Sequence, residues 1–180
     1  MRHSPVSLAL LLACSLSGFA AEDSLQLSAF EEPISAEWRS NSEKIPAFTL
    51  IQDPEKVKEG AGSGMWRATA PSNPWLMLNE CPPDWSDYEA LSVWIYAEVA
   101  NEQQINFVAE SGEGYYLHPV KVSWTGWNHL VIPFASFNSP RPVNGWNDIS
   151  HFRITLKGYG QQEPYEDTVL YFDDLRLIRR

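Results

Sequence analysis

Leu91-Ser-Val-Trp-Ile-Tyr-Ala-Glu98 is the stretch that decides the fold, because its two faces carry different side chains at a strict period of two. One row is aliphatic and consists of Leu91, Val93, Ile95 and Ala97. The other row mixes aromatic and polar residues and consists of Ser92, Trp94, Tyr96 and Glu98. This alternation is typical of a β-strand whose aliphatic face lies in a core. The second face then either carries a function or lies beneath a loop.

Similar alternating runs recur along the chain, with turn residues between them. We predict strands at 24–30, 47–51, 64–70, 75–79, 91–98, 103–110, 115–123, 127–134, 151–157 and 168–178. The polar segment 39–46 is predicted to be a loop, and no stretch has convincing helical spacing of apolar residues. About ten short strands separated by turns predict an all-β fold, namely an antiparallel two-sheet β-sandwich.

The N-terminal segment 1–20 has the pattern of a secretory signal peptide. The basic residue Arg2 precedes the apolar run at 6–13, and small residues follow as far as Ala20. We predict cleavage after Ala20 or Ala21. The segment 22–180 is then one sandwich domain that is secreted, or is held in the periplasm or at the cell surface.

Two cysteines refine this prediction. Cys14 offers an alternative, in which the N-terminal segment is a lipoprotein signal and Cys14 becomes the lipidated first residue. Cys81 is the single cysteine that remains after cleavage at Ala20 or Ala21, so the domain has no intramolecular disulfide. We therefore expect its stability to come from burial and from a metal ion.

The charge and the motifs exclude several classes of function. The formal net charge of −10 makes nucleic acid and anionic membranes poor partners, and we find no run of the about 20 apolar residues that a transmembrane helix needs. Histidines at 118, 129 and 151 lack zinc-site spacing, and no Gly-x-Ser-x-Gly motif occurs. Acid pairs such as Asp84 and Asp87 are expected to be surface charges. We predict no catalytic residues and no enzyme activity.

Three motifs resemble those of a known group of sandwich domains. They are Gly126-Trp127-x-x-Leu-Val-Ile-Pro-Phe-x-x-Phe137, the closing Leu170-Tyr-Phe-Asp-Asp-Leu-Arg-Leu177 and the opening Ala29-Phe-Glu-Glu32. They resemble the jelly-roll, galactose-binding-like sandwich of many carbohydrate-binding modules. The order of Trp38, Met65-Trp66, Leu91 to Tyr96 and Gly126-Trp127 is also similar to the N-terminal sandwich domain of chondroitin-type polysaccharide lyases. This resemblance implies an extracellular polysaccharide-binding module with a structural calcium ion.

The resemblance also implies where the calcium ion binds. It places Glu31 and Asp173 next to each other where the first and last strands meet, with backbone carbonyls from the turn at 60–64. Calcium prefers six to eight oxygen ligands that mix carboxylates and carbonyls, so an acidic strand junction fits. The alternative is that these carboxylates are solvated strand ends, paired with Arg176.

The alternation of inward and outward side chains in the strand at 91–98 and in its expected neighbours predicts a ligand-binding face. We expect strands 103–110 and 151–157 to share its core, so that their second faces join the aromatic row. The predicted ligand-binding residues are Trp75, Trp94, Tyr96, Asn106, Tyr116 and Arg153, with Gln104, Glu110 and His118 near them. Aromatic planes beside amides, carboxylates and a guanidinium group suit sugar rings. In the alternative, the aromatic row lies beneath the loops at 71–90 and 138–147, and Arg153 pairs with Glu110.

The sequence therefore predicts a secreted, non-catalytic protein that holds a poly- or oligosaccharide on the aromatic face of one sheet. The main alternative is a structural or protein-interaction domain of the same fold, with a secreted or cell-surface protein as its partner. The complex I intermediate-associated family, which shares the Trp-x-x-Ile-Pro-Phe and terminal patterns without binding sugar, keeps that alternative open. A small polysaccharide-degrading enzyme is the third possibility.

Overall fold

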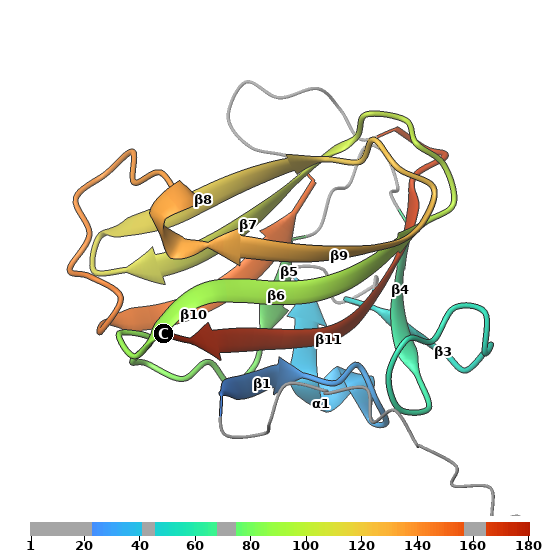
Figure 1. The fold of residues 1–180 in the computed structure, drawn as a ribbon, viewed down its shortest axis with the longest axis horizontal. Coiled ribbons are helices and arrows are strands. Elements are labelled where there is room, and N and C mark those ends of the chain that lie inside the picture. The colour runs from blue at the N-terminus through green and yellow to red at the C-terminus, as the bar shows by residue number, and fades with distance from the viewer. Residues whose placement is uncertain (1–22, 41–45, 68–74, 157–164) are drawn as a thin grey trace, which may run out of the picture.

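The computed structural model describes residues 23–40, 46–67, 75–156 and 165–180, which form two antiparallel β-sheets around one core (Figure 1). This confirms the predicted all-β sandwich. The predicted signal peptide and Cys14 lie outside the described residues. Within the described part, no helix has the length and hydropathy needed to cross a membrane.

The six-stranded sheet is built around β11, the closing strand. Its strand order is β3-β4-β11-β6-β9, and β1 pairs with the second half of β11 beyond the end of β4. The strands are β1 (Ser24–Ser28), β3 (Thr49–Ile51), β4 (Ser63–Arg67), β6 (Tyr88–Ala97), β9 (Gly126–Pro133) and β11 (Val169–Arg179). Strand β6 contains the stretch from Leu91 to Ala97 and lies between β11 and β9.

The five-stranded sheet has the order β2-β5-β10-β7-β8, with β10 in the middle. Its strands are β2 (Trp38–Ser40), β5 (Leu76–Leu78), β7 (Gln104–Ser111), β8 (Gly114–Lys121) and β10 (Ile149–Thr155). Two short helices, α1 (Ile34–Glu37) and the 3-10 helix η1 (Phe134–Ser136), complete the described elements. The predicted loop at 39–46 is wrong at Arg39 and Ser40, which belong to β2. Neither β2 nor the two helices are predictable from the sequence, because three or four residues are too few to show a period.

The core between the sheets contains the aliphatic row of β6, as predicted. Leu91, Val93, Ile95 and Ala97 are each 0 % exposed. Aromatic side chains fill much of the rest, and the fully buried Trp85 illustrates their packing. Its ring lies 5.7 Å from that of Phe152 and 6.0 Å from that of Phe134. Part of the high aromatic content therefore stabilises the fold by burial.

The apolar rows of β6, β7 and β10 face this core from opposite walls, because β6 belongs to one sheet and the other two strands belong to the other. Their second faces consequently point to opposite sides of the molecule. The predicted single face that joins Trp94 and Tyr96 to Asn106 and Arg153 is therefore wrong. The alternation of apolar residues shows which side chains face the core. It does not show which of the two sheets around that core each strand belongs to.

Candidate functional site

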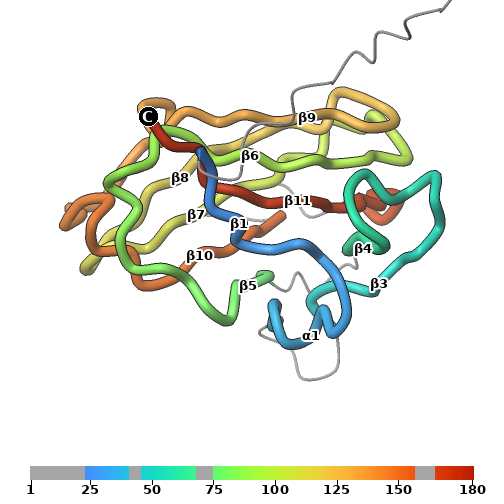
Figure 2. Tube along the Cα trace, turned by 60° about the horizontal axis from the view of Figure 1, so that its bottom comes forward, coloured from blue at the N-terminus to red at the C-terminus, as the bar shows by residue number. Residues whose placement is uncertain are grey.

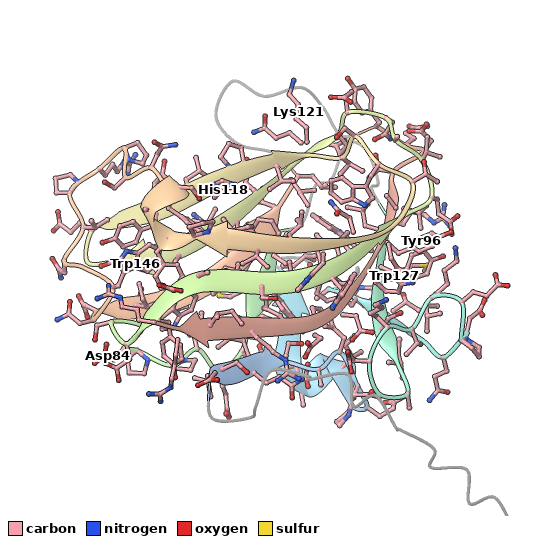
Figure 3. All side chains as sticks on the ribbon, viewed as in Figure 1. Asp84, Tyr96, His118, Lys121, Trp127 and Trp146 are labelled. Atoms are coloured by element: carbon pink, nitrogen blue, oxygen red, sulfur yellow. The ribbon has the colours of Figure 1, made fainter. Side chains whose placement is uncertain are left out.

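The outer face of the six-stranded sheet carries the predicted aromatic row of β6, paired with a second row on β9. Trp94 lies opposite His129, and Tyr96 lies opposite Trp127. The His129 ring stacks on Trp94 at 4.3 Å between centroids, and Trp127 makes an edge contact with Tyr96 at 5.6 Å. Figure 3 shows Tyr96 and Trp127 side by side at the end of the molecule that carries β3 and β4. These rings thus contact one another across neighbouring strands.

Lysines from the loop between β3 and β4 lie over these rings. The Lys56 ammonium group is 3.5 Å from the centroid of Tyr96, and that of Lys58 is 4.3 Å from the centroid of Trp94. Lys56 also pairs with Glu98 at 3.0 Å. Each cation–π contact contributes about 0.5–2 kcal/mol, so a sugar ring would have to displace favourable contacts to stack here. The contacts agree with the alternative, in which a loop lies over these rings, but the loop is 52–62 rather than 71–90 or 138–147.

The outer face of the five-stranded sheet has a different composition. Across its middle, Arg153 of β10 lies between Met77 of β5 and Val108 of β7. One row away, Glu110 of β7 lies between His151 of β10 and Tyr115 of β8. Trp75 directly precedes β5 and has the parity of Met77, which places it on the same side. We call this surface the ligand face and define it by Trp75, Glu110, Tyr115, His151 and Arg153.

A charged cluster occupies the centre of the ligand face. Glu110 Oε1 lies 3.1 Å from Arg153 Nη2, and Glu110 Oε2 lies 3.3 Å from His151 Nδ1. The Arg153–Glu110 pair, which the sequence suggested as the alternative to a ligand-binding role for Arg153, is therefore present. The Arg153 Nε atom, in contrast, is buried and has no hydrogen-bond partner among the described residues. The side chain as a whole is 28 % exposed, so a ligand on this face would meet the exposed N–H groups of the guanidinium rather than Nε.

Two aromatic rings flank this cluster at diagonally opposite corners of the ligand face. Trp75 directly precedes Leu76, which pairs with Ile154 of the central strand β10, and Tyr115 lies on the edge strand β8 at the level of His151. Both rings are partly exposed. In the part of the chain that the structure describes, neither ring has a stacking, cation or hydrogen-bonding partner. Their flat surfaces are available to a ligand, unlike those of Trp94 and Tyr96.

Tyr116 does not belong to this face, contrary to the prediction. It lies opposite the core residue Ala109, and its ring stacks on Trp146 at 3.8 Å. His118 has the same parity and packs against Phe137 at 5.3 Å. Tyr115 and Tyr116 are adjacent residues of the same type, so alternation of polarity could not show which one faces outward. A register shift of one residue moves every side chain of a strand to the opposite face. The sequence therefore did not show that Tyr115, and not Tyr116, lies on the ligand face.

Asn106 is on the predicted sheet but is 1 % exposed. Its amide nitrogen donates to the carbonyl of Thr155 at 3.3 Å, and its Oδ1 accepts from Gln104 Nε2 at 2.8 Å. Its amide group therefore supports the sheet rather than offering hydrogen bonds to a ligand. Of the six predicted ligand-binding residues, the structure brings Trp75, Asn106 and Arg153 to one sheet face, and Asn106 lies beneath its surface.

The two predicted metal ligands, Glu31 and Asp173, both accept hydrogen bonds from backbone N–H groups of the turn at 58–62. Glu31 Oε1 accepts hydrogen bonds from the backbone N–H groups of Ala61 at 2.7 Å and Gly62 at 3.2 Å. Asp173 Oδ2 accepts from those of Lys58 at 2.7 Å and Glu59 at 3.0 Å. Both carboxylates therefore bind the turn that was predicted to supply carbonyl ligands. Arg176, the alternative partner, pairs with Asp174 at 2.6 Å.

Asp173 has an unused oxygen. The residue is 0 % exposed, and its Oδ1 atom has no hydrogen-bond partner in the described part of the chain. Burial raises the pKa of the Asp173 carboxyl to about 6, although backbone N–H groups of Glu59 and Lys58 favour its charged form. Among the described residues, no three His, Cys, Asp or Glu side chains gather as a metal site. A cation here would therefore need backbone carbonyls as well as the two carboxylates.

The fold is similar to those of solved carbohydrate-binding modules. One is the family 11 module of the cellulosomal cellulase Lic26A-Cel5E of Clostridium thermocellum, with 17 % identity and a TM-score of 0.63 over 87 % of this chain and 95 % of that one. Another is the family 30 module of the cellulosomal cellulase Cel9D-Cel44B of the same organism, with 16 % identity and a TM-score of 0.60 over 87 % and 98 %. No family model and no curated protein matches the sequence. At these identities the similarity shows the fold, and the similarity to polysaccharide lyases stays a prediction.

Proposed function

We propose that this protein is a non-catalytic carbohydrate-binding protein that holds a neutral poly- or oligosaccharide across the ligand face. One observation carries the proposal: the partly exposed rings of Trp75 and Tyr115 have no partners among the described residues and flank the Arg153 side chain, which is 28 % exposed. Sugar rings present flat C–H surfaces bordered by hydroxyl groups. Free aromatic planes beside a partly exposed guanidinium group match that surface.

Charge favours a neutral glycan over an anionic one. Glu110 already neutralises Arg153, and the chain has a formal net charge of −10. An acidic sugar would therefore meet a carboxylate and an overall negative field. The fold supports binding without catalysis, since the two similar solved structures are named as carbohydrate-binding modules. Export through the predicted signal peptide would bring the domain to extracellular polysaccharides.

Removal of the Arg153 side chain is expected to weaken binding about tenfold or more, because a hydrogen bond to a charged group contributes about 1.5–3 kcal/mol. The measurement is electrophoresis of residues 22–180 in gels that contain neutral plant, algal or microbial polysaccharides. The wild type should be retarded in at least one gel, Arg153→Ala much less, and Arg153→Lys to an intermediate degree. The variants should melt like the wild type, because the lost ion pair is partly exposed and contributes little. If no polysaccharide retards the wild type, the proposal fails.

We also propose that a structural calcium ion binds between the Glu31 and Asp173 carboxylates and the turn at 58–62. The unpartnered Asp173 Oδ1 supports this, because a buried carboxylate oxygen without a hydrogen bond is costly unless a cation or donor compensates it. The geometry of the turn also supports it. A Cβ atom at Gly60 would lie 2.1 Å from Glu31 Oε1, and one at Gly62 would lie 3.2 Å from the carbonyl oxygen of Phe30. At Gly62, Glu31 Oε2 and the carbonyl oxygen of Phe30 would each lie 3.2 Å from that Cβ atom, and calcium binds carboxylate and carbonyl oxygens of this kind.

A further inference from the structure

A pocket of about 690 Å³ opens where β5 ends in the five-stranded sheet. After Leu78 the chain leaves this sheet, and β1, α1, β2 and the start of β10 surround the space that it vacates. Figure 2 shows α1 and β1 next to the end of β5. The polar residues of its lining that matter here are Gln26, Glu37, Arg39, Glu80 and His151. A pocket of this size accommodates a small ligand.

The pocket is continuous with the ligand face. His151 lines the pocket and also contacts Glu110 in the charged cluster of that face. Arg39 lines it as well and lies opposite Met77, on the same side of the sheet as Arg153. A glycan that runs across the ligand face would therefore pass the mouth of the pocket.

Among the described residues, the pocket offers several free acceptors beside the N–H donors that Arg39 does not use for Asn79 and Met77. Glu37 uses Oε2 to accept from Ser28 Oγ at 2.5 Å and from the backbone N–H of Phe30 at 3.2 Å, and its Oε1 has no partner among the described residues. Gln26 donates through Nε2 to Asp174 at 2.8 Å, and within the described part of the chain its Oε1 accepts no hydrogen bond. Glu80 is exposed and has no polar partner among the described residues. These acceptors suit hydroxyl donors.

The lining disfavours other ligand classes. Two carboxylates, those of Glu37 and Glu80, face one guanidinium group, so an anionic substituent would be repelled. Among the described residues, no phenylalanine, tyrosine or tryptophan lines the pocket, so stacking on a large aromatic ring is not its means of recognition. Cys81 also lines it, but burial raises the pKa of that thiol to about 12, which keeps it protonated at neutral pH. The pocket therefore lacks a nucleophilic thiolate.

We infer that this pocket binds one neutral pyranose unit of the glycan, presented as a single-sugar branch or as a chain end, through hydrogen bonds to Glu37, Glu80 and Gln26. The inference rests on the proposed function, because the glycan on the ligand face delivers this unit. It adds a selectivity that the face alone does not give. The face recognises a backbone, whereas the pocket distinguishes a decorated or terminated chain from an uninterrupted one.

The test fills the pocket without altering the ligand face. Ala36 lines the pocket on α1, and its neighbour Ser35 does not, although both are exposed. Ala36→Phe should block the pocket, and Ser35→Phe is the matched control on the same helix. Calorimetric titration would use two neutral oligosaccharides of the backbone retained most strongly in gels, a linear hexasaccharide and the same hexasaccharide with one neutral single-sugar branch. Glu80→Ala tests the hydrogen bonds, with the exposed Glu89→Ala on β6 as its control.

For a branch-binding pocket, the branched ligand should bind about tenfold more tightly than the linear one. Ala36→Phe should then remove this preference and leave the affinity for the linear ligand unchanged. For a pocket that binds a chain end, Ala36→Phe should weaken the binding of the linear ligand as well. Equal binding of both ligands to both Ala36→Phe and the wild type would overturn the inference and leave the proposed function intact. Failure of every glycan to bind the wild type would overturn both.

Discussion

The double variant Trp75→Ala, Tyr115→Ala should lose measurable glycan binding. One ring face of on the order of 80 Å² contributes about 2 kcal/mol when a sugar covers it, at about 25 cal/mol per Å². Two rings therefore contribute about 4 kcal/mol, which corresponds to roughly a thousandfold in Kd. Because Kd values of single sheet-face sites lie in the micromolar to millimolar range by the same arithmetic, calorimetry should detect no heat for the variant. Each single variant should retain weak binding.

A matched control lies on the other sheet. Trp127 is also a partly exposed tryptophan, but it contacts Tyr96 and donates to the carbonyl of Glu55 at 3.3 Å. Trp127→Ala should change the Kd less than about twofold. Both variants should keep the circular dichroism and melting behaviour of a folded domain. Loss of binding in Trp127→Ala with full binding in the double variant would move the site to the six-stranded sheet and refute the assignment.

Calcium removal should lower the melting temperature by about 5–10 °C. A ligand present at a hundredfold excess over its Kd stabilises the native state by about 2.7 kcal/mol, and 1 kcal/mol corresponds to about 2–4 °C for a domain of this size. The measurement is a thermal melt of residues 22–180 in EGTA and in millimolar calcium, with magnesium as a comparison. Calcium should raise the midpoint and magnesium should not, because magnesium demands a tighter octahedral shell.

Two variants separate a calcium site from a general effect of ionic strength. Asp173→Asn removes the buried charge with little change of shape, so its melting temperature should be the same in EGTA and in calcium. Glu32→Ala changes the exposed carboxylate next to Glu31 and should keep the full calcium shift. An unchanged midpoint for the wild type in both solutions would contradict the calcium proposal.

The sequence was sufficient to predict the fold class, because the alternation of Leu91, Val93 and Ile95 is imposed by burial of one strand face. It also identified Arg153 and Glu110 as neighbours, because their strands pair directly. It could not assign β6 to one sheet and β7 to the other, since both present the same aliphatic signal to a shared core. Which strands pair depends on contacts between residues far apart in the sequence, and local periodicity does not encode those contacts.

The sequence also did not show which loop covers the aromatic rings of the six-stranded sheet. Lys56 and Lys58 lie in a polar loop whose composition indicates solvent exposure, yet backbone hydrogen bonds to Asp173 fold that loop over Trp94 and Tyr96. A carboxylate on the last strand thereby decides which aromatic rings are open. On β8, the side that Tyr115 faces depended on register, which two adjacent tyrosines do not reveal.

Amide chemical-shift mapping tests the central claim most directly. A ¹⁵N-labelled domain would be titrated with the neutral oligosaccharide that binds best, and the shifts of the two sheets would be compared. We predict that the largest changes fall on β10, β7, β8 and the residues around Trp75, together with the Arg153 Nε–H signal, while β6 and β9 stay unchanged. If the shifts were concentrated on Trp94, Tyr96 and Trp127 and the Arg153 Nε–H signal did not change, the glycan would bind the opposite sheet and the account would be contradicted.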